Sequence, residues 1–262
     1  MKFIISAQTD VGIKRDTNQD SLSVMTASTN IGKIVFAILC DGMGGLSKGE
    51  VASASVVQAF SNWFINEFPN VLHFDEYDDY IEKAWKRIIT KQNEKIANYG
   101  KKLRISLGTT ATAMLILKNK VYIVHVGDTR VYEITNSIRQ ITTDQTMLER
   151  EIKRGNVTQV DGKQDPRRHI LLQCIGSSNV VVPDIYVGQV SENAVYMLCS
   201  DGFRHEISTA EIYDNLNPKK LMNENVMKEQ IDYLIQENIN REEQDNISCI
   251  LVRTIEGEEQ ID

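Results

Sequence analysis

The sequence predicts an α+β fold in which antiparallel sheets are covered by helices. Strand-like segments come in clusters with helical segments between them, whereas a doubly wound parallel sheet would alternate strands and helices throughout. Residues 33–40 form a continuous apolar run, as expected of a strand that is buried on both faces. The 262 residues contain no internal repeat and no convincing linker. We therefore expect one domain over residues 1–255 and a disordered acidic tail over 256–262.

The expected strands are short apolar or alternating segments with turn residues at their ends. They span residues 2–8, 20–26, 33–40, 185–190, 194–200 and 247–254. A further segment, residues 108–134, is predicted to form a meander of three strands, with turns at 118–120 and 127–128.

The expected helices span residues 51–68, 76–99, 143–154 and 217–240. Ser47 stands three residues before Glu50, which predicts a capping box at the start of the first helix. Asn217 followed by Pro218 predicts the N-cap and the first position of the last helix. Residues 155–168 are polar and aperiodic, and loops of this length tend to be functional or mobile.

Composition and charge narrow the classes of function. A net charge of −7 disfavours broad binding to nucleic acid or to an anionic membrane, because either needs a basic face. The N-terminal apolar run is too short for a signal peptide, and no later run approaches about 18 apolar residues. We therefore expect a cytoplasmic protein and a monomer, with neither nucleic acid nor membrane among its partners.

The cysteines and histidines do not predict a metal site. The four cysteines include no CxxC pair, and three of them lie in apolar strand-like runs, so we expect small, buried and reduced side chains. The four histidines include no HExxH motif. His125 lies inside an apolar strand and is expected to be a hydrogen-bonded core residue rather than a ligand.

Acidic residues recur beside the ends of apolar strands that are far apart in the sequence. They are Asp20, Asp41, Asp128, Asp201 and Asp245. Because strands that share a sheet bring their ends together, we expect these carboxylates to converge at one rim. A cluster of unpaired acids raises the pKa of its members and persists when cations neutralise it. Ligands that are all oxygen select a hard ion, Mg²⁺ or Mn²⁺.

The Asp41-Gly42 step taken alone is most simply a turn, and the recurrence of acids at several strand ends is what favours a metal ligand. Gly42 has no Cβ, so its carbonyl group can approach an ion. The glycines do not fit a nucleotide-binding loop. Lys48 is followed by Gly49 instead of the Ser or Thr of a Walker A motif, and Ser47 occupies the place of the third glycine of a dinucleotide fingerprint.

Six short motifs in order carry a resemblance to a known family. They are RDTNQDS (15–21), DGMGG (41–45), GTT (108–110), GDTR (127–130), CSDGF (199–203) and QDNIS (244–248). In this order and spacing they resemble the metal-dependent PP2C-type (PPM) serine/threonine phosphatases in their compact bacterial form. The resemblance covers nearly the whole chain. It implies a four-layer α-β-β-α sandwich of two antiparallel sheets flanked by helices, with a centre of two Mg²⁺ or Mn²⁺ ions at one end.

The resemblance implies a role for each acid at that centre. Asp41 would bridge both core ions, and Gly42 would contribute its carbonyl oxygen. Asp201 and Asp245 would hold the first ion, and Asp20 would bind through metal-bound water.

Other roles implied by the resemblance concern the substrate and a further ion. Arg15 would bind the substrate phosphate, so that Arg15, Asp41 and Asp201 form the catalytic set. Asp128 would join Asp201 at a third, weaker ion. Residues 155–168 fall where the family carries its flap.

The implied activity is hydrolysis of phosphoserine and phosphothreonine in proteins, by in-line attack of a hydroxide that bridges the ions and without a covalent phosphoenzyme. An aspartyl-phosphate route is rejected, because it usually needs Asp-x-Asp and Met43 occupies the second position. A Hanks-type kinase is the partner that the resemblance implies. Two alternatives stay open: a catalytically silent phosphoprotein-binding relative, and a phosphohydrolase of small molecules.

Two departures from the family pattern affect the expected chemistry. Gln19 stands where many relatives have glutamate, which predicts weakened or rearranged binding of the second ion. Met43 replaces the histidine proposed as general acid in the eukaryotic form, so a metal-bound water would have to protonate the leaving oxygen.

Overall fold

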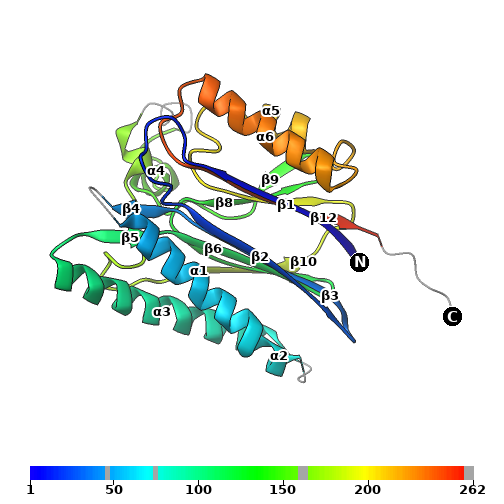
Figure 1. Cartoon of the computed structure of the whole chain (residues 1–262), viewed down its shortest axis with the longest axis horizontal. Coiled ribbons are helices and arrows are strands. Elements are labelled where there is room, and N and C mark those ends of the chain that lie inside the picture. Colours follow the sequence, from blue (N-terminus) through cyan, green and yellow to red (C-terminus); the bar gives the residue numbers. More distant parts are fainter. Residues whose placement is uncertain (45–47, 73–75, 159–164, 257–262) are drawn as a thin grey trace.

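The fold is the four-layer sandwich that the sequence predicts. A computed structural model describes residues 1–44, 48–72, 76–158 and 165–256. Two five-stranded antiparallel sheets lie face to face, and helices cover the outer face of each sheet (Figure 1). The expected tail lies almost wholly outside the described residues, as does the middle of the expected 155–168 loop.

The first sheet has the strand order β10-β7-β6-β3-β2. Its strands are β2 (Ser21–Thr29), β3 (Gly32–Cys40), β6 (Ala111–Leu117), β7 (Lys120–Val126) and β10 (Asp184–Gln189). The second sheet has the order β1-β12-β11-β8-β9. Its strands are β1 (Lys2–Asp10), β8 (Arg130–Ile134), β9 (Ile138–Gln140), β11 (Val195–Cys199) and β12 (Ile247–Ile255). A separate two-stranded ribbon consists of β4 (Gly42–Gly44) and β5 (Leu107–Thr109).

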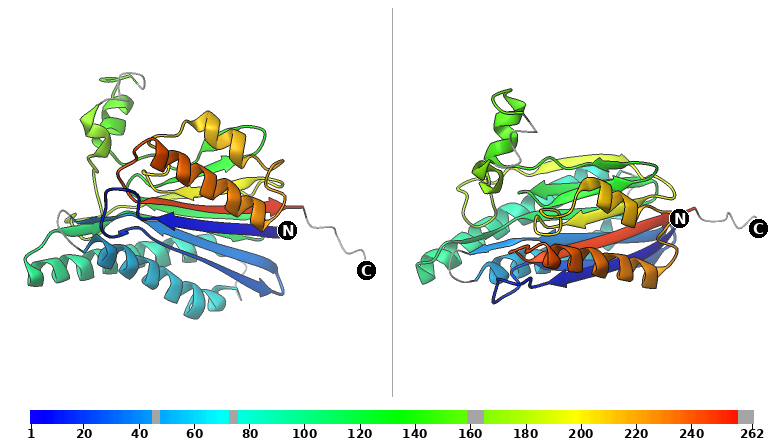
Figure 2. Two further views of the ribbon diagram at one scale, coloured as in Figure 1. Left: turned by 45° about the horizontal axis from the view of Figure 1, so that its top comes forward. Right: turned by 90° about the horizontal axis from the view of Figure 1, so that it is seen from above.

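The helices fall into three groups according to the part of the sandwich that they cover. The first sheet is covered by α1 (Gly49–Asn66), α2 (Phe68–Val71) and α3 (Asp78–Leu103). The second sheet is covered by α5 (Thr209–Leu216) and α6 (Glu224–Asn240). At one end of the sandwich stand the short helix α4 (Met147–Lys153) and the 3₁₀ helix η2 (Pro166–His169), which project beyond the sheets (Figure 2).

Strand β3 shows why the sandwich needs both flanking layers. Ile34, Phe36 and Ile38 pack against the helices, whereas Val35 and Leu39 pack between the two sheets. Because successive side chains of a strand point to opposite faces, a strand covered on both sides is apolar at every position. The unbroken run in the sequence therefore identified β3 correctly.

Aromatic side chains fill the layer between the first sheet and its helices. The ring of Phe36 stacks on Phe64 with 5.3 Å between centroids and lies 6.0 Å from Trp63. Trp63 in turn meets Trp85 of α3 edge to face at 5.7 Å. These large buried rings hold α1 and α3 against the sheet.

Two predicted helix starts are wrong. The N-cap of α1 is Lys48, which adopts the left-handed conformation with φ of 83° and makes no side-chain capping bond. Ser47, predicted as the capping residue, lies outside the described residues. Asn217 is the C-cap of α5, and the last helix begins only after Asn223, whose side chain accepts from the backbone N–H of Val226. Pro218 therefore follows a helix instead of opening one.

The predicted three-stranded meander is also wrong in its last step. β6 and β7 pair in the first sheet, but β8 belongs to the second sheet, where it pairs with β11. The chain crosses between the sheets at Gly127, whose φ is +109° and where a Cβ would lie 2.5 Å from the Thr110 side chain. Glycine is needed for this tight crossing, and the crossing places Asp128 between the two sheets.

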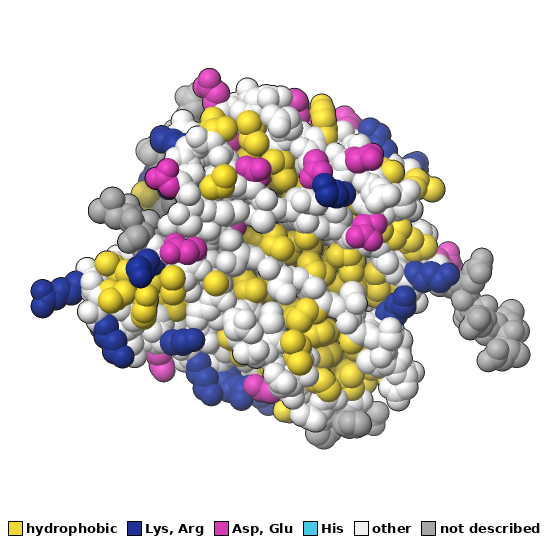
Figure 3. Space-filling view, viewed as in Figure 1, with side chains coloured by type: hydrophobic (Ala, Val, Ile, Leu, Met, Phe, Trp, Pro, Cys, Tyr) yellow, Lys and Arg dark blue, Asp and Glu magenta, His cyan; other side chains and the backbone are white. Residues whose placement is uncertain are grey.

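The edge strands β1 and β2 lie side by side along one face of the molecule. Figure 3 shows hydrophobic side chains gathered in a band between the two helical layers, where these strands run. A groove of about 660 Å³ lies there and is lined by residues that include Phe3, Ile5 and Val24.

None of the helices in the described part of the chain has the length and apolar character that a membrane span requires.

His125 is a fully buried, hydrogen-bonded core residue, as predicted. Its Nδ1 atom lies 2.9 Å from the hydroxyl of Thr112, and its Nε2 atom lies 3.1 Å from the carbonyl oxygen of Thr143. The carbonyl can only accept, so Nε2 carries the proton and Nδ1 accepts from Thr112. Burial lowers the pKa of His125, although nearby carboxylates such as Asp144 oppose the shift.

Acidification is therefore expected to destabilise the protein through His125. The pKa of His125 is lower in the folded state than the ordinary value of 6.5, so the unfolded state binds more protons and the free energy of unfolding falls as the pH falls below 6.5. The effect is at most about 1.4 kcal/mol per pH unit. Urea unfolding at about pH 7 and about pH 5.5 measures it. His125→Gln should lose this part of the dependence, and an equal dependence in both proteins would contradict the assignment.

Candidate metal centre

Strand register brings the predicted acidic residues to one end of the sandwich. In the first sheet Ser21 pairs with Cys40, so Asp20, just before β2, lies beside Asp41, just after β3. In the second sheet Cys199 pairs with Cys249, so the residues that follow β11 lie beside those that precede β12. Asp201 and Asp245 therefore meet at this end, and the crossing from β7 to β8 adds Asp128.

All five predicted carboxylates are removed from bulk solvent to some degree. Asp20 is 9% exposed and Asp128 is 6% exposed, and the other three are half-buried. Asp41 experiences the negative charge of each of the others. The sequence prediction of one converging cluster is therefore confirmed as a matter of geometry, whatever the role of each member.

The backbone holds Asp41 from several directions. Its N–H donates to the hydroxyl of Thr110 at 2.8 Å, and its carbonyl oxygen accepts from the N–H of Thr110 at 2.9 Å. The next residue, Gly42, donates its N–H to the carbonyl oxygen of Gln19. A Cβ on Gly42 would lie 2.5 Å from that oxygen and 2.4 Å from the carbonyl oxygen of Gly49. Glycine thus lets three backbone segments meet beside the carboxylates.

Asn246 is a structural residue of the site that the sequence reasoning missed. Its side-chain oxygen accepts from the N–H of Gln19 at 2.8 Å, and its side-chain nitrogen donates to the carbonyl oxygen of Val11 at 2.9 Å. It therefore joins the loop that carries Asp20 to the start of β12. A Cβ on Gly202 would lie 2.3 Å from the backbone oxygen of Asn246, so the turn after Asp201 packs directly on the same strand.

The carboxylates raise one another's pKa. Burial raises the pKa of Asp20 to about 7, and the charge of Asp201 adds to the effect. The pKa of Asp128 is raised to about 7 for the same two reasons. The pKa of Asp41 lies well above its usual value because of burial and the charges of Asp20 and Asp201. The folded chain therefore resists charging these groups together unless a cation is present.

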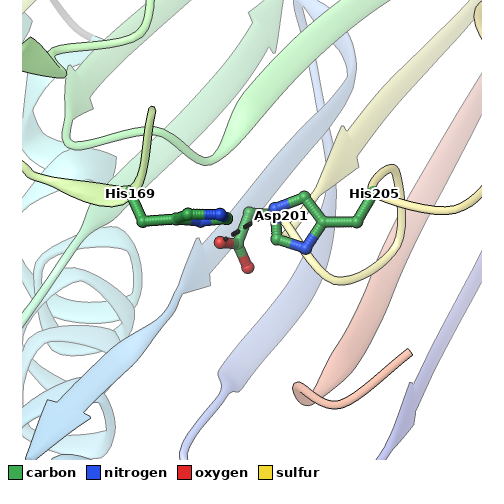
Figure 4. A group of neighbouring side chains, drawn as sticks. All are labelled: His169, Asp201 and His205. Carbon is green, nitrogen blue, oxygen red and sulfur yellow. Dashed lines mark ion pairs between the residues drawn. The ribbon is translucent and has the colours of Figure 1, made fainter. Parts of the chain in front are cut away.

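Asp201 behaves differently because a histidine faces it. Nε2 of His205 lies 3.3 Å from Oδ2 of Asp201 (Figure 4). Nδ1 of His205 lies 3.3 Å from Oε2 of Glu243. Burial disfavours the charge on Asp201, but the hydrogen bond and charge of His205, together with the charges of Arg204 and His169, hold the pKa of Asp201 below its usual range. Burial likewise opposes the charge on His205, yet Asp201 and Glu243 raise its pKa to about 9.

Arg15 lies at the centre and pairs with one of the predicted ligands. Its Nε donates to Oδ1 of Asp245 at 3.1 Å, and its Nη2 donates to Oδ2 at 2.7 Å. About half of the Arg15 side chain is exposed. It lines a cavity of about 530 Å³ together with Lys14 and His205. The guanidinium is therefore within reach of a ligand that enters this cavity.

A second group of charges beside Asp128 was also missed. Asp144 binds the guanidinium of Arg130 through both oxygens, at 2.8 and 2.7 Å. Arg204 lies 3.5 Å from Asp144 and donates to the backbone oxygen of Asp128 at 3.0 Å. The GDTR motif gave a signal for Arg130, but Asp144 has no comparable pattern around it. The network fixes the crossing segment on which Asp128 stands.

The residues at this centre fit a hard divalent cation. Oδ1 of Asp201 is buried and lacks a hydrogen-bond partner among the described residues. The buried oxygens of Asp20 lie near the hydroxyls of Ser200 and Ser248 but make no hydrogen bond of ordinary geometry with a described residue. Buried polar atoms normally have partners, so these oxygens need an explanation. Clustered carboxylate oxygens are the ligands that Mg²⁺ and Mn²⁺ take. A cation there would satisfy the free oxygens and offset the repulsion among the carboxylates.

Comparisons with known proteins agree with this site and fold. Residues 13–251 match the family described as protein phosphatase 2C. The serine/threonine phosphatase Stp of Listeria innocua is 29% identical over 248 residues, which cover 94% of this chain and 93% of that protein. Protein phosphatase PhpP of Streptococcus pneumoniae is 29% identical over 213 residues, 80% of this chain and 82% of that one.

Solved structures of bacterial phosphatases have the same fold as this chain. The serine/threonine phosphatase of S. agalactiae superposes with a TM-score of 0.82 and 29% identity, over 97% of this chain and all of that one. The catalytic domain of the protein phosphatase PstP, in complex with two manganese ions, has a TM-score of 0.77 and 25% identity over 97% of this chain and 100% of that one.

The fold and the acidic centre together define a metal-dependent phosphatase. The chain belongs to the protein phosphatase 2C family. It is a protein serine/threonine phosphatase of this family.

Binding of Mn²⁺ is expected to stabilise the protein through the carboxylate cluster. At about 100 times the dissociation constant the gain is about 2.7 kcal/mol, or about 5–10 °C in melting temperature. Asp41→Asn should melt higher than the wild type without metal, because it removes one repelling charge, and should lose most of the Mn²⁺ shift. Asp79→Asn, which changes an exposed carboxylate on α3, is the control and should keep the full shift. An unchanged Mn²⁺ shift in Asp41→Asn would contradict the assignment.

Proposed function

We propose that the chain hydrolyses phosphoserine and phosphothreonine in proteins by in-line attack of hydroxide, without a covalent phosphoenzyme. The convergence of five carboxylates at one end of the sandwich is the observation that carries this proposal. Divalent cations held by these carboxylates would supply hydroxide from water near neutral pH and would offset charge on the phosphoryl oxygens. The chain's own residues then have to hold the phosphate in line with the attacking oxygen and keep other nucleophiles away from it.

The ligand roles within this proposal follow the position of each acid. Asp41 would bridge the two core ions, and the carbonyl oxygen of Gly42 would be a further ligand. Asp201 and Asp245, which meet at the ends of β11 and β12, would hold the first ion. Asp20 would bind through water.

Asp128 has a different place in the proposal. It stands on the crossing between the sheets, with Arg204 bound to its backbone oxygen. Its side chain experiences the charge of Asp201. We assign Asp128 and Asp201 to a third, weaker ion.

The cysteines next to the centre are unsuited to a covalent route. Burial raises the pKa of Cys199 to about 12, and it raises the pKa of Cys40 well above its usual value. Both are buried thiols at neutral pH, whereas the thiolate is the nucleophilic form. Together with Met43 at the second position after Asp41, this favours direct attack by a water-derived nucleophile.

Arg15 is proposed to bind the substrate phosphate. Its planar guanidinium can donate two parallel charged hydrogen bonds to phosphate oxygens, as it does to the carboxylate of Asp245. The half-exposed side chain of Arg15 can leave Asp245 and bind an incoming phosphate by a movement of that side chain alone.

The enzyme is further proposed to act in the cytoplasm as a monomer on proteins phosphorylated by a Hanks-type kinase, which the resemblance of the motifs supports.

Hydrolysis of p-nitrophenyl phosphate tests the metal-dependent reaction. We expect turnover that rises strongly with Mn²⁺ and that falls at least about 100-fold in Asp201→Asn, because a metal ligand contributes more than the residues that merely orient ligands. Circular dichroism of the variant checks that it is folded. Turnover that is independent of Mn²⁺, or that survives Asp201→Asn, would refute the mechanism.

The role of Arg15 is tested with a phosphothreonine peptide. Arg15→Ala should raise KM about 10- to 100-fold, since charged hydrogen bonds contribute about 1.5–3 kcal/mol. Lys14→Ala is the matched control, because Lys14 is the adjacent cation and its ammonium binds the side chain of Gln244. It should change KM by less than about threefold. An unchanged KM in Arg15→Ala would remove this residue from the phosphate site.

A further inference from the structure

A group of nitrogen and oxygen ligands lies beside the carboxylate cluster. His169 at the end of η2 and His205 after β11 stand on either side of Asp201 (Figure 4). One ligand atom from each of the three residues lies within 4.8 Å of the other two. The two imidazole rings meet edge to face, with 5.1 Å between their centroids. The group therefore joins the projecting α4–η2 segment to the centre of the molecule.

His205 has the surroundings of a metal-binding imidazole. Its Nδ1 faces Oε2 of Glu243, and its Nε2 is the atom that faces Asp201. Glu243 is itself 5% exposed, and its other oxygen accepts the backbone N–H groups of Gln244 and Asp245. A carboxylate that accepts from one nitrogen of an imidazole orients the ring and leaves the other nitrogen for a metal ion. Glu243 is thus placed to fix the ligand atom of His205.

Asp201 can serve two neighbouring ions with its two oxygens. Oδ2 faces His205, whereas Oδ1 is buried without a hydrogen-bond partner among the described residues. Oδ2 is therefore available to an ion bound by the histidines, and Oδ1 is available to an ion in the carboxylate cluster.

The histidine group is accessible from solvent. His169 and His205 both line the cavity of about 530 Å³ that Arg15 also lines, and both line a larger one of about 850 Å³ next to Asp128. An ion can therefore reach both imidazoles from these cavities. Nε2 of His169 accepts from Nε of Arg168 at 2.6 Å, so the ion binds Nδ1 of His169 or takes the place of that guanidinium.

We propose that His169, Asp201 and His205 form a Zn²⁺ site that adjoins the Mn²⁺ or Mg²⁺ centre, shares Asp201 with it and inhibits the enzyme when it is occupied. Two imidazoles and one carboxylate are a usual ligand set for Zn²⁺, with a fourth position open to water. The same nitrogen ligands bind Mn²⁺ much more weakly than Zn²⁺, and Mg²⁺ prefers oxygen. The ligand set therefore favours the inhibitory Zn²⁺ over the activating Mn²⁺ and Mg²⁺.

Inhibition follows from two features of the site. Zn²⁺ at Oδ2 would leave only Oδ1 of Asp201 for the core ions, to which the proposed function assigns this residue. It also ties η2 across the cavity that Arg15 lines. The inhibitory effect rests on the proposed function, but binding of Zn²⁺ does not.

Calorimetric titration of the full chain with Zn²⁺ in saturating Mg²⁺ tests the site directly. We expect one Zn²⁺ per chain, at least tenfold weaker binding in His169→Ala and in His205→Ala, and about 10- to 100-fold weaker binding in Glu243→Gln. His125→Gln is the matched control, because it removes an imidazole that is buried and hydrogen-bonded to Thr112 and Thr143, and it should bind as the wild type does. Absence of Zn²⁺ binding, or an unchanged affinity in either His169→Ala or His205→Ala, would overturn the proposal.

Hydrolysis of p-nitrophenyl phosphate in Mg²⁺ provides the second readout. Zn²⁺ should inhibit the wild type, and the Zn²⁺ concentration for half inhibition should rise at least tenfold in His169→Ala. Equal sensitivity to Zn²⁺ in both proteins would overturn the inhibitory role. Histidine-dependent binding of Zn²⁺ by a protein without hydrolytic activity would refute the proposed function and support the site.

Discussion

Mutual repulsion among five carboxylates at the ends of two stacked sheets is the interaction on which the rest of the centre depends. Burial strengthens it, because less water screens the charges, and it raises the pKa of Asp20 and of Asp128 to about 7. Such a cluster is stable when its supports are rigid and when cations join it. Oxygens of Asp20 and Asp201 that lack hydrogen bonds of ordinary geometry with described residues are the atoms that a bound cation would satisfy.

The rigid supports come from backbone geometry rather than from charge. Asp41 is held by two hydrogen bonds with Thr110, and Asn246 ties the loop before Asp20 to the start of β12. The crossing at Gly127 lets one connection contribute to both sheets at once. A centre of this kind needs its ligands held in place before an ion arrives, and strand ends in a tightly packed sandwich provide that placement.

Much of this arrangement could be predicted from the sequence, because it depends on patterns within short stretches of residues. The apolar run of β3 and the acids beside strand ends are short-range patterns, so the layers and the cluster were found. Helix starts were predicted less well, because an Asn-Pro pair can follow the end of a helix as readily as it can begin one. The shift of β8 to the other sheet depends on a crossing that has no pattern of its own.

The histidine group shows what a sequence pattern does not reveal. His169 and His205 are single residues in separate segments, and neither has a ligand-like spacing to the other. Their meeting depends on how η2 folds back toward Asp201. Likewise, Asp144 acquires its importance only when Arg130 and Arg204 are brought to it by the fold.

Anomalous diffraction from a crystal grown with Mn²⁺ tests the central claim most directly. The account predicts two strong peaks that flank Asp41, both within about 2.0–2.6 Å of a carboxylate oxygen of that residue. Ions bound away from Asp41, or a centre in which Asp41 contacts no ion, would contradict the account.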